Sequence, residues 1–325
     1  MNTENNDYDI TELQISQKKI NNAVKNIMSG QLAMANRVSS IKKLPKQKTY
    51  TQIPNFDSYE DSGMGMGHWN KEELYSREDI QYYLNNYSYR SDDFSNESIT
   101  NNILFSGCSF TFGVGIPQEF TWSKIVSDHF CYENVINLGI PGIGHRAIIF
   151  DVIEKIEKFG NPEAVVILFP NPDRFTNALF YEDDIDHEFV DISNSIRWSD
   201  PKIAEMLTKV LNVTASIKDF IESVKMLEYY MAAKQIPFFW STWSYSLDQA
   251  LSKYNKKITF LNNYTSMFFS DEAIEAKAAE QKSKNQDHMF WLIAREGHPG
   301  IKDNEYFANV FIKTMTDKFV GKAQR

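Results

Sequence analysis

Four short segments of the chain hold the residue types that nucleophilic catalysis needs. Ser109 lies in the glycine-rich segment 107–113, and His298 lies in Gly-His-Pro-Gly near the end of the chain. Between them come segment 137–144, which is also glycine-rich, and segment 169–171, which ends in an asparagine. A serine hydroxyl attacks a carbonyl only when a base within hydrogen-bond reach takes its proton, and histidine can take and return that proton. The pair predicts acyl transfer at Ser109 with His298 as base and acid.

Secondary-structure elements must bring these segments together, and the apolar pattern predicts which ones do. The first three segments each follow a short apolar run, as strands do, and amphipathic runs separate them. The predicted strands are residues 103–105, 135–138, 164–169, 237–240 and 258–261, and the predicted helices are residues 118–130, 144–159, 202–234, 271–284 and 302–318. This alternation predicts an α/β fold with a parallel sheet and helices on both faces. Reactive loops gather at the carboxyl ends of such strands.

The four segments in this order resemble the sequence blocks of the SGNH, or GDSL-type, hydrolase family. GCSFTFGVG resembles its first block, NLGIPGIG its second and GHPG its last, over about residues 100–320. The resemblance implies a three-layer, flavodoxin-like sheet and a serine esterase that needs no cofactor. It also implies an oxyanion hole made by the backbone N–H groups of Ser109 and Gly142 and the side-chain amide of Asn171.

The chain departs from the family pattern at three places. Cys108 stands where the family has an aspartate before the nucleophile, and the third block lacks its glycine. Arg295 stands three residues before His298, where the family has the acid of the triad. Glu296, two residues before His298, is the candidate acid that orients the imidazole, and Asp287 is the alternative.

Each of these residues also has a structural alternative. Ser109 suits a helix cap, His298 a loop, Asn171 a turn between two prolines, and the glycines of segment 137–144 suit backbone turns with positive φ. The glycine-rich turn at Ser109 could cradle a phosphate, but it lacks the Lys-Ser/Thr ending of a P-loop. The remaining histidines show no metal-ligand spacing, so no metal site is expected.

Aromatic residues gather after the fourth predicted strand. Trp240, Trp243 and Tyr245 lie there, and the acidic insertion 172–200 adds further aromatic residues. Such rings suit the wall of a carbohydrate-binding cleft, but the favoured interpretation is packing in the core and at interfaces.

The N-terminal part has a different pattern. Residues 10–41 follow a 3-4 spacing in which eight of ten positions are apolar: Ile10, Leu13, Ile20, Val24, Ile27, Met34, Val38 and Ile41, with Gln17 and Gln31 at the other two. This pattern predicts a heptad helix that forms a homo-oligomer or docks on a partner helix, and the alternative is a helix folded back on its own domain. We therefore divide the chain into a heptad helix (1–45), a connector (46–98) and a hydrolase-like domain (99–325).

Composition excludes several classes of protein. Lys and Arg total 34 and Asp and Glu 43, and the resulting net charge of −9 argues against a nucleic-acid partner. Two cysteines exclude a disulfide framework. No apolar run reaches the roughly 18 residues of a membrane span, and the polar N-terminus does not resemble a secretory signal. We expect a soluble protein, cytoplasmic in the producing cell or carried by a virus particle.

Two hypotheses about function follow. The first is a serine esterase that cleaves acyl esters, such as acetyl groups on a polysaccharide. The second is an inactive SGNH-fold protein that serves as a structural or binding subunit of a larger assembly. The atypical third block and the missing acid motivate the second hypothesis, and the Asn/Lys/Ile/Phe-rich composition resembles that of phage and viral proteins.

Overall fold

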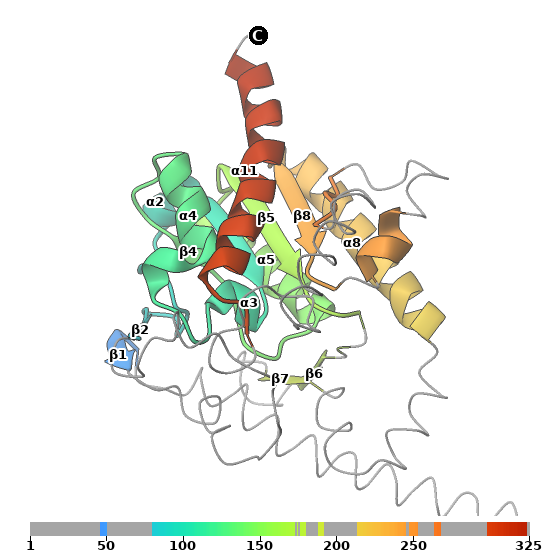
Figure 1. Ribbon diagram of the computed structural model, residues 1–325, viewed down its shortest axis with the longest axis horizontal. Coiled ribbons are helices and arrows are strands. Elements are labelled where there is room, and N and C mark those ends of the chain that lie inside the picture. Colours follow the sequence, from blue (N-terminus) through green and yellow to red (C-terminus); the bar gives the residue numbers. More distant parts are fainter. Residues whose placement is uncertain are drawn as a thin grey trace, which may run out of the picture.

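A computed structural model gives the structure of the chain (Figure 1). It describes residues 46–50, 80–172, 174, 176–179, 188–191, 213–244, 247–252, 263–267 and 298–323. The predicted heptad helix 10–41, the predicted strand 258–261 and the predicted helix 271–284 lie outside these residues. The coiled-coil assignment and the division into three parts therefore stay predictions.

A parallel sheet of four strands forms the centre of the fold. Its order is β4 (Ile136–Asn137), β3 (Ile103–Gly107), β5 (Ala164–Phe169) and β8 (Phe238–Thr242). Every residue of β3, β5 and β8 is buried, because both faces of the sheet are covered. The predicted parallel α/β fold is confirmed. Strand β4, which follows β3 along the chain, lies at the edge of the sheet beside β3.

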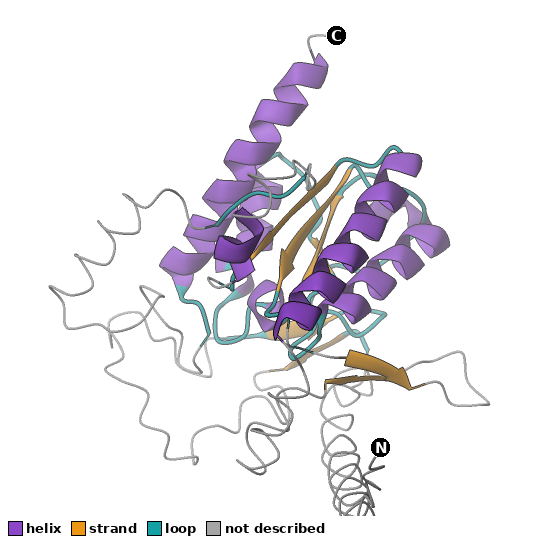
Figure 2. Cartoon of the chain, turned by 90° about the vertical axis from the view of Figure 1, so that its right-hand side faces the viewer, coloured by secondary structure: helices purple, strands orange, loops and turns teal. Residues whose placement is uncertain are grey.

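Helices cover both faces of this sheet (Figure 2). Helices α4 (Trp122–His129) and α11 (Ile301–Ala323) pack together on one face, and α5 (His145–Phe159) and α8 (Val213–Ala233) pack together on the other. The short helix α2 (Asn96–Thr100) contacts α5. Within the described part of the chain, no helix combines the length and apolar character needed to cross a bilayer.

Four short strands were not predicted from the sequence. The acidic insertion contains an antiparallel pair, β6 (Thr176–Leu179) and β7 (Glu188–Asp191). A second antiparallel pair joins β1 (Lys48–Tyr50) to β2 (Tyr82–Leu84). In Figure 1, β6 and β7 lie below the sheet, beyond the edge at which the four-residue helix α3 (Ser109–Phe112) is found.

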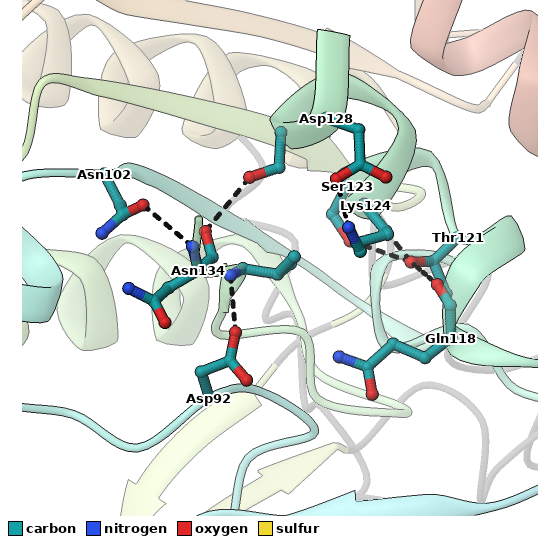
Figure 3. Close-up of polar contacts among 10 residues, drawn as sticks. Asp92, Asn102, Gln118, Thr121, Ser123, Lys124, Asp128 and Asn134 are labelled. Atoms are coloured by element: carbon teal, nitrogen blue, oxygen red, sulfur yellow. Dashed lines mark hydrogen bonds and ion pairs between the residues drawn. The ribbon is translucent and has the colours of Figure 1, made fainter. Parts of the chain in front are cut away.

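Residues 80–94 pack against the sheet domain although their sequence is largely polar. Asp92 Oδ2 accepts a hydrogen bond from the backbone N–H of Val135 (2.7 Å), just before β4. The neighbouring Asn134 N–H donates to Asn102 Oδ1 (3.3 Å), so this loop is held from two sides (Figure 3). The hydroxyl of Ser91 bonds to Val135 O (2.7 Å). These bonds fix segment 80–94 to the start of β4.

Arg90 is the most buried charge of segment 80–94, with 1% of its surface exposed. Its Nη1 donates to the carbonyls of Phe112 (3.2 Å) and Gly113, and its Nη2 donates to those of Ile116 (2.9 Å) and Gln81 (3.2 Å). The guanidinium carbon lies 4.5 Å from the ring centroid of Tyr82, which supplies a favourable π face. Burial lowers the pKa of Arg90 to about 10, so the group stays cationic at neutral pH. Arg90 thus ties segment 80–94 to the chain that follows Ser109.

The Arg90→Met exchange should lower the free energy of unfolding by about 3 kcal/mol or more, because four carbonyls lose a charged donor inside the protein. Urea unfolding followed by circular dichroism measures this. The control is Arg146→Met, which removes a guanidinium that is 63% exposed and should change stability by less than about 1 kcal/mol. Equal losses in the two variants would show that Arg90 does not hold the loop.

Candidate active site

Ser109 begins helix α3 directly after strand β3, with Cys108 between them. The turn requires glycine at position 107, where φ is +155° and a Cβ atom would lie 2.1 Å from Thr111 Oγ1 and 2.6 Å from Leu168 O. The strand can therefore turn sharply into the helix, and this places Ser109 at the carboxyl end of the sheet. Ser109 is 4% exposed in this conformation.

The Ser109 hydroxyl has one described partner. Its Oγ donates to Cys108 Sγ at 3.9 Å, and the indole N–H of Trp243 donates to the same sulfur at 3.3 Å. No hydrogen bond joins Ser109 to His298 among the residues that the structure describes. A thiol sulfur is a weak acceptor, so the hydroxyl is held loosely.

His298 lies beside the helix that carries Ser109. Its ring meets that of Phe110, the next residue after Ser109, edge to face, with the centroids 5.8 Å apart. The turn after His298 is fixed by helix α11, because Asp303 Oδ2 accepts from the N–H of Gly300 (3.2 Å) and Asn304 Nδ2 donates to the carbonyl of Gly300 (2.9 Å). The structure thus brings the first and last blocks together.

The second block is packed against the first, and the side chain of Asn137 joins the two. Asn137 Nδ2 donates to the carbonyl of Thr111 (2.7 Å), and Asn137 Oδ1 accepts from the N–H of Gly139 (2.7 Å). Only glycine fits at position 139, because a Cβ atom there would lie 2.4 Å from the backbone nitrogen of Phe112. Gly142 follows in the same loop with φ of +82°. The loop that carries Gly142 therefore lies beside helix α3.

Asn171 comes to the same edge through the register of the sheet. Gly107 pairs with Leu168, so Ser109 and Asn171 follow neighbouring strands by similar distances along the chain. Within the part of the chain that the structure describes, no hydrogen bond engages the N–H of Ser109, the N–H of Gly142 or the side-chain amide of Asn171. These three donors are the ones that the sequence resemblance assigns to an oxyanion hole.

The candidate acids Glu296 and Asp287 lie outside the described residues, so the acid of the triad stays a prediction. The described residues hold no group of three His, Cys, Asp or Glu side chains that could bind a metal. A polar cavity of about 300 Å³ lies at the opposite edge of the sheet and is not part of this site. Its lining includes Ser95, Asn101, Asn102, Cys131 and Asn134.

The aromatic residues that follow strand β8 divide between the core and the site. Trp240 is fully buried under Phe169 and Phe220. Trp243 stacks on Phe110 with the ring centroids 4.4 Å apart, so it lies next to Ser109. Trp243 thus belongs to the site, and Trp240 belongs to the core.

A buried histidine begins helix α5, directly after the second block. His145 is 1% exposed, and its Nε2 lies 3.2 Å from Asp219 Oδ2 on α8. Arg146 donates to the same carboxylate through Nε (3.0 Å). Burial lowers the pKa of His145 to about 4, although Asp219 opposes the shift. The ring is neutral at pH 7, and it anchors the second block to α8.

This shift predicts how stability depends on pH. Between pH 6.5 and about 4, His145 is protonated in the unfolded chain but neutral in the folded chain. The free energy of unfolding therefore falls as the pH decreases through this range. The loss from this group should reach about 3 kcal/mol. The His145→Asn variant should lack that part of the pH dependence in urea unfolding at pH 7 and pH 4.5. The control is His129→Asn, at the exposed end of α4. This variant should show the same pH dependence of stability as the wild-type protein. If the stability of the His145 variant changed between pH 7 and pH 4.5 as much as that of the wild-type protein, His145 would not be the group responsible.

The chain is a parallel α/β protein in which the candidate residues Ser109 and Asn171 follow the carboxyl ends of neighbouring strands. No protein-family model and no curated protein matches the sequence. Solved structures do match, and they include members of the family that the four blocks resemble.

Three of these structures illustrate the likeness. A member of the lipolytic protein G-D-S-L family from Veillonella parvula is 12% identical, with a TM-score of 0.37 over 66% of this chain and 97% of that one. The psychrotrophic esterase EstA from Pseudoalteromonas is 13% identical, with a TM-score of 0.39 over 67% and 98%. The acetyl xylan esterase AlAXEase is 13% identical, with a TM-score of 0.39 over 65% and 98%. Likeness at this level supports no conclusion about activity.

Proposed function

We propose that the chain is a serine ester hydrolase in which Ser109 is the nucleophile and His298 is the general base and acid. The observation that supports the proposal is the contact between the rings of His298 and Phe110, because His298 thereby lies beside the residue that follows Ser109. The two residues come from opposite ends of the domain, and helix packing alone does not require a histidine there.

The reaction follows from these positions. His298 takes the proton of Ser109 Oγ as the oxygen bonds to the acyl carbon, and the carbonyl electrons move to the oxygen. The N–H groups of Ser109 and Gly142 and the amide of Asn171 stabilise this oxyanion. The intermediate then expels the alcohol, which receives the proton from His298. Water, activated by the same histidine, hydrolyses the acyl-enzyme and restores Ser109.

Glu296 is the proposed partner of His298, with Asp287 as the alternative. A carboxylate behind the ring would fix its tautomer and stabilise the imidazolium. The substrate class is an acyl ester, and an acetyl ester on a polysaccharide fits the aromatic wall at Trp243. No cofactor takes part in these steps.

The competing proposal is an inactive subunit that keeps the fold. Two observations favour it: Ser109 is only 4% exposed, and its hydroxyl bonds to Cys108. It predicts no hydrolysis and no covalent labelling at Ser109.

The test is Ser109→Ala, assayed with a chromogenic acetyl ester and with a serine-reactive phosphonate. Hydrolysis should fall by about 10³-fold or more, because the covalent route is lost, and labelling should disappear. The control is Ser106→Ala on β3, whose buried hydroxyl has no hydrogen-bond partner among the described residues. That variant should keep both signals. Equal hydrolysis and labelling in wild type and Ser109→Ala would refute the proposal.

A further inference from the structure

Arg174 places a positive charge beside the candidate active site. Its backbone N–H donates to the carbonyl of Asn171 (3.2 Å), which fixes Arg174 to the third block. Its guanidinium carbon lies 5.3 Å from the ring centroid of Trp243. Trp243 in turn stacks on Phe110, and Phe110 contacts His298. A continuous line of ring contacts therefore joins the guanidinium to His298 through Phe110, the residue that follows Ser109.

One end of this guanidinium is buried without a partner. Arg174 Nη1 is inaccessible to solvent, and it has no hydrogen-bond acceptor among the described residues. In the other described arginines the terminal nitrogens are engaged, because both Nη atoms of Arg90 donate to carbonyls and Arg146 donates to Asp219, although Arg90 Nε is also buried without an acceptor. A buried donor without an acceptor destabilises the folded state, and an acceptor on a ligand would remove that cost.

We propose that Arg174 binds an anionic group of the substrate, so that the preferred substrates are esters that also carry a carboxylate. This inference rests on the proposed ester hydrolysis at Ser109. Trp243 contacts the guanidinium, and a carboxylate that reached its N–H groups would form charge-assisted hydrogen bonds, which are short and directional. In a chain with a net charge of −9, this local charge supplies the attraction that the rest of the surface does not.

The test compares pairs of esters in which an uncharged group replaces the carboxylate. On the acyl side, the pair is para-nitrophenyl hydrogen glutarate and para-nitrophenyl pentanoate. On the alcohol side, the pair is para-acetoxybenzoate and para-acetoxybenzamide. The wild-type protein should prefer the charged member of at least one pair, and the pair that shows the preference identifies the part of the ester that Arg174 contacts.

Arg174→Gln should lower kcat/KM for the preferred charged ester by about 10- to 100-fold, mainly through KM, and should change the neutral ester by less than about 2-fold. Arg174→Lys should retain part of the preference, because lysine keeps the positive charge but lacks the planar guanidinium that can form two parallel hydrogen bonds to a carboxylate. The control is Lys234→Gln, at the opposite edge of the sheet, where Lys234 pairs with Glu157 (2.8 Å). It removes one charge and should leave both rates unchanged.

Binding separates this proposal from the proposed reaction. In a Ser109→Ala background, calorimetry with para-nitrophenyl hydrogen glutarate and with para-acetoxybenzoate should detect binding of the preferred ester, and Arg174→Gln should remove it. If the wild-type protein hydrolyses no ester but this binding is found, the reaction is wrong and the anion site stands. If neutral and charged esters are hydrolysed equally by wild type and Arg174→Gln, the reaction stands and the anion site is refuted. Absence of both hydrolysis and binding refutes the anion site as well.

Discussion

The position of Ser109 depends on one buried cation that lies outside the sheet. Helix α3 has only four residues, so it cannot satisfy its own last carbonyls, and the chain that follows it turns away without regular structure. Arg90 supplies the missing donors to Phe112, Gly113 and Ile116. A cation is tolerated there because aromatic rings and carbonyl dipoles replace its water shell. Segment 80–94, helix α3 and the loop after it are thereby held together.

Close backbone contacts extend this arrangement to the other blocks. Gly107 and Gly139 remove the side chains that would separate strand β3, helix α3 and the second-block loop. The N–H of Ile140 donates to the carbonyl of Gly107 (3.1 Å), which adds a direct backbone bond between the two loops. Asn171 needs no such contact, because the parallel register of β3 and β5 already brings it to this edge. Three blocks are therefore placed by the sheet, and the fourth is placed by α11.

The sequence predicts those parts of the structure that leave a local pattern. Strand β5 matches its predicted residues, because a central parallel strand is apolar throughout. Ser109 and His298 were singled out because the segments around them resemble the first and last SGNH blocks, and their catalytic roles stay predictions. The role of Arg90 was not predicted, since its acceptors are backbone carbonyls, which no side-chain pattern reveals. The pairing of His145 with Asp219 joins two helices that are distant in sequence, and single residues on amphipathic helices give no signal for such a pair.

Cys108 bears directly on the choice between a hydrolase and an inactive subunit. Its thiol is the described partner of the Ser109 hydroxyl, and it stands where the SGNH family has an aspartate. The thiol holds that hydroxyl weakly, at 3.9 Å, while the indole N–H of Trp243 donates to the same sulfur at 3.3 Å. The hydroxyl can therefore rotate away from Cys108 at little cost, and the Trp243 contact keeps the sulfur in place as it does so. A substrate that displaced this weak contact would leave the Ser109 hydroxyl free to bond with His298, so the contact with Cys108 is only weak support for an inactive subunit.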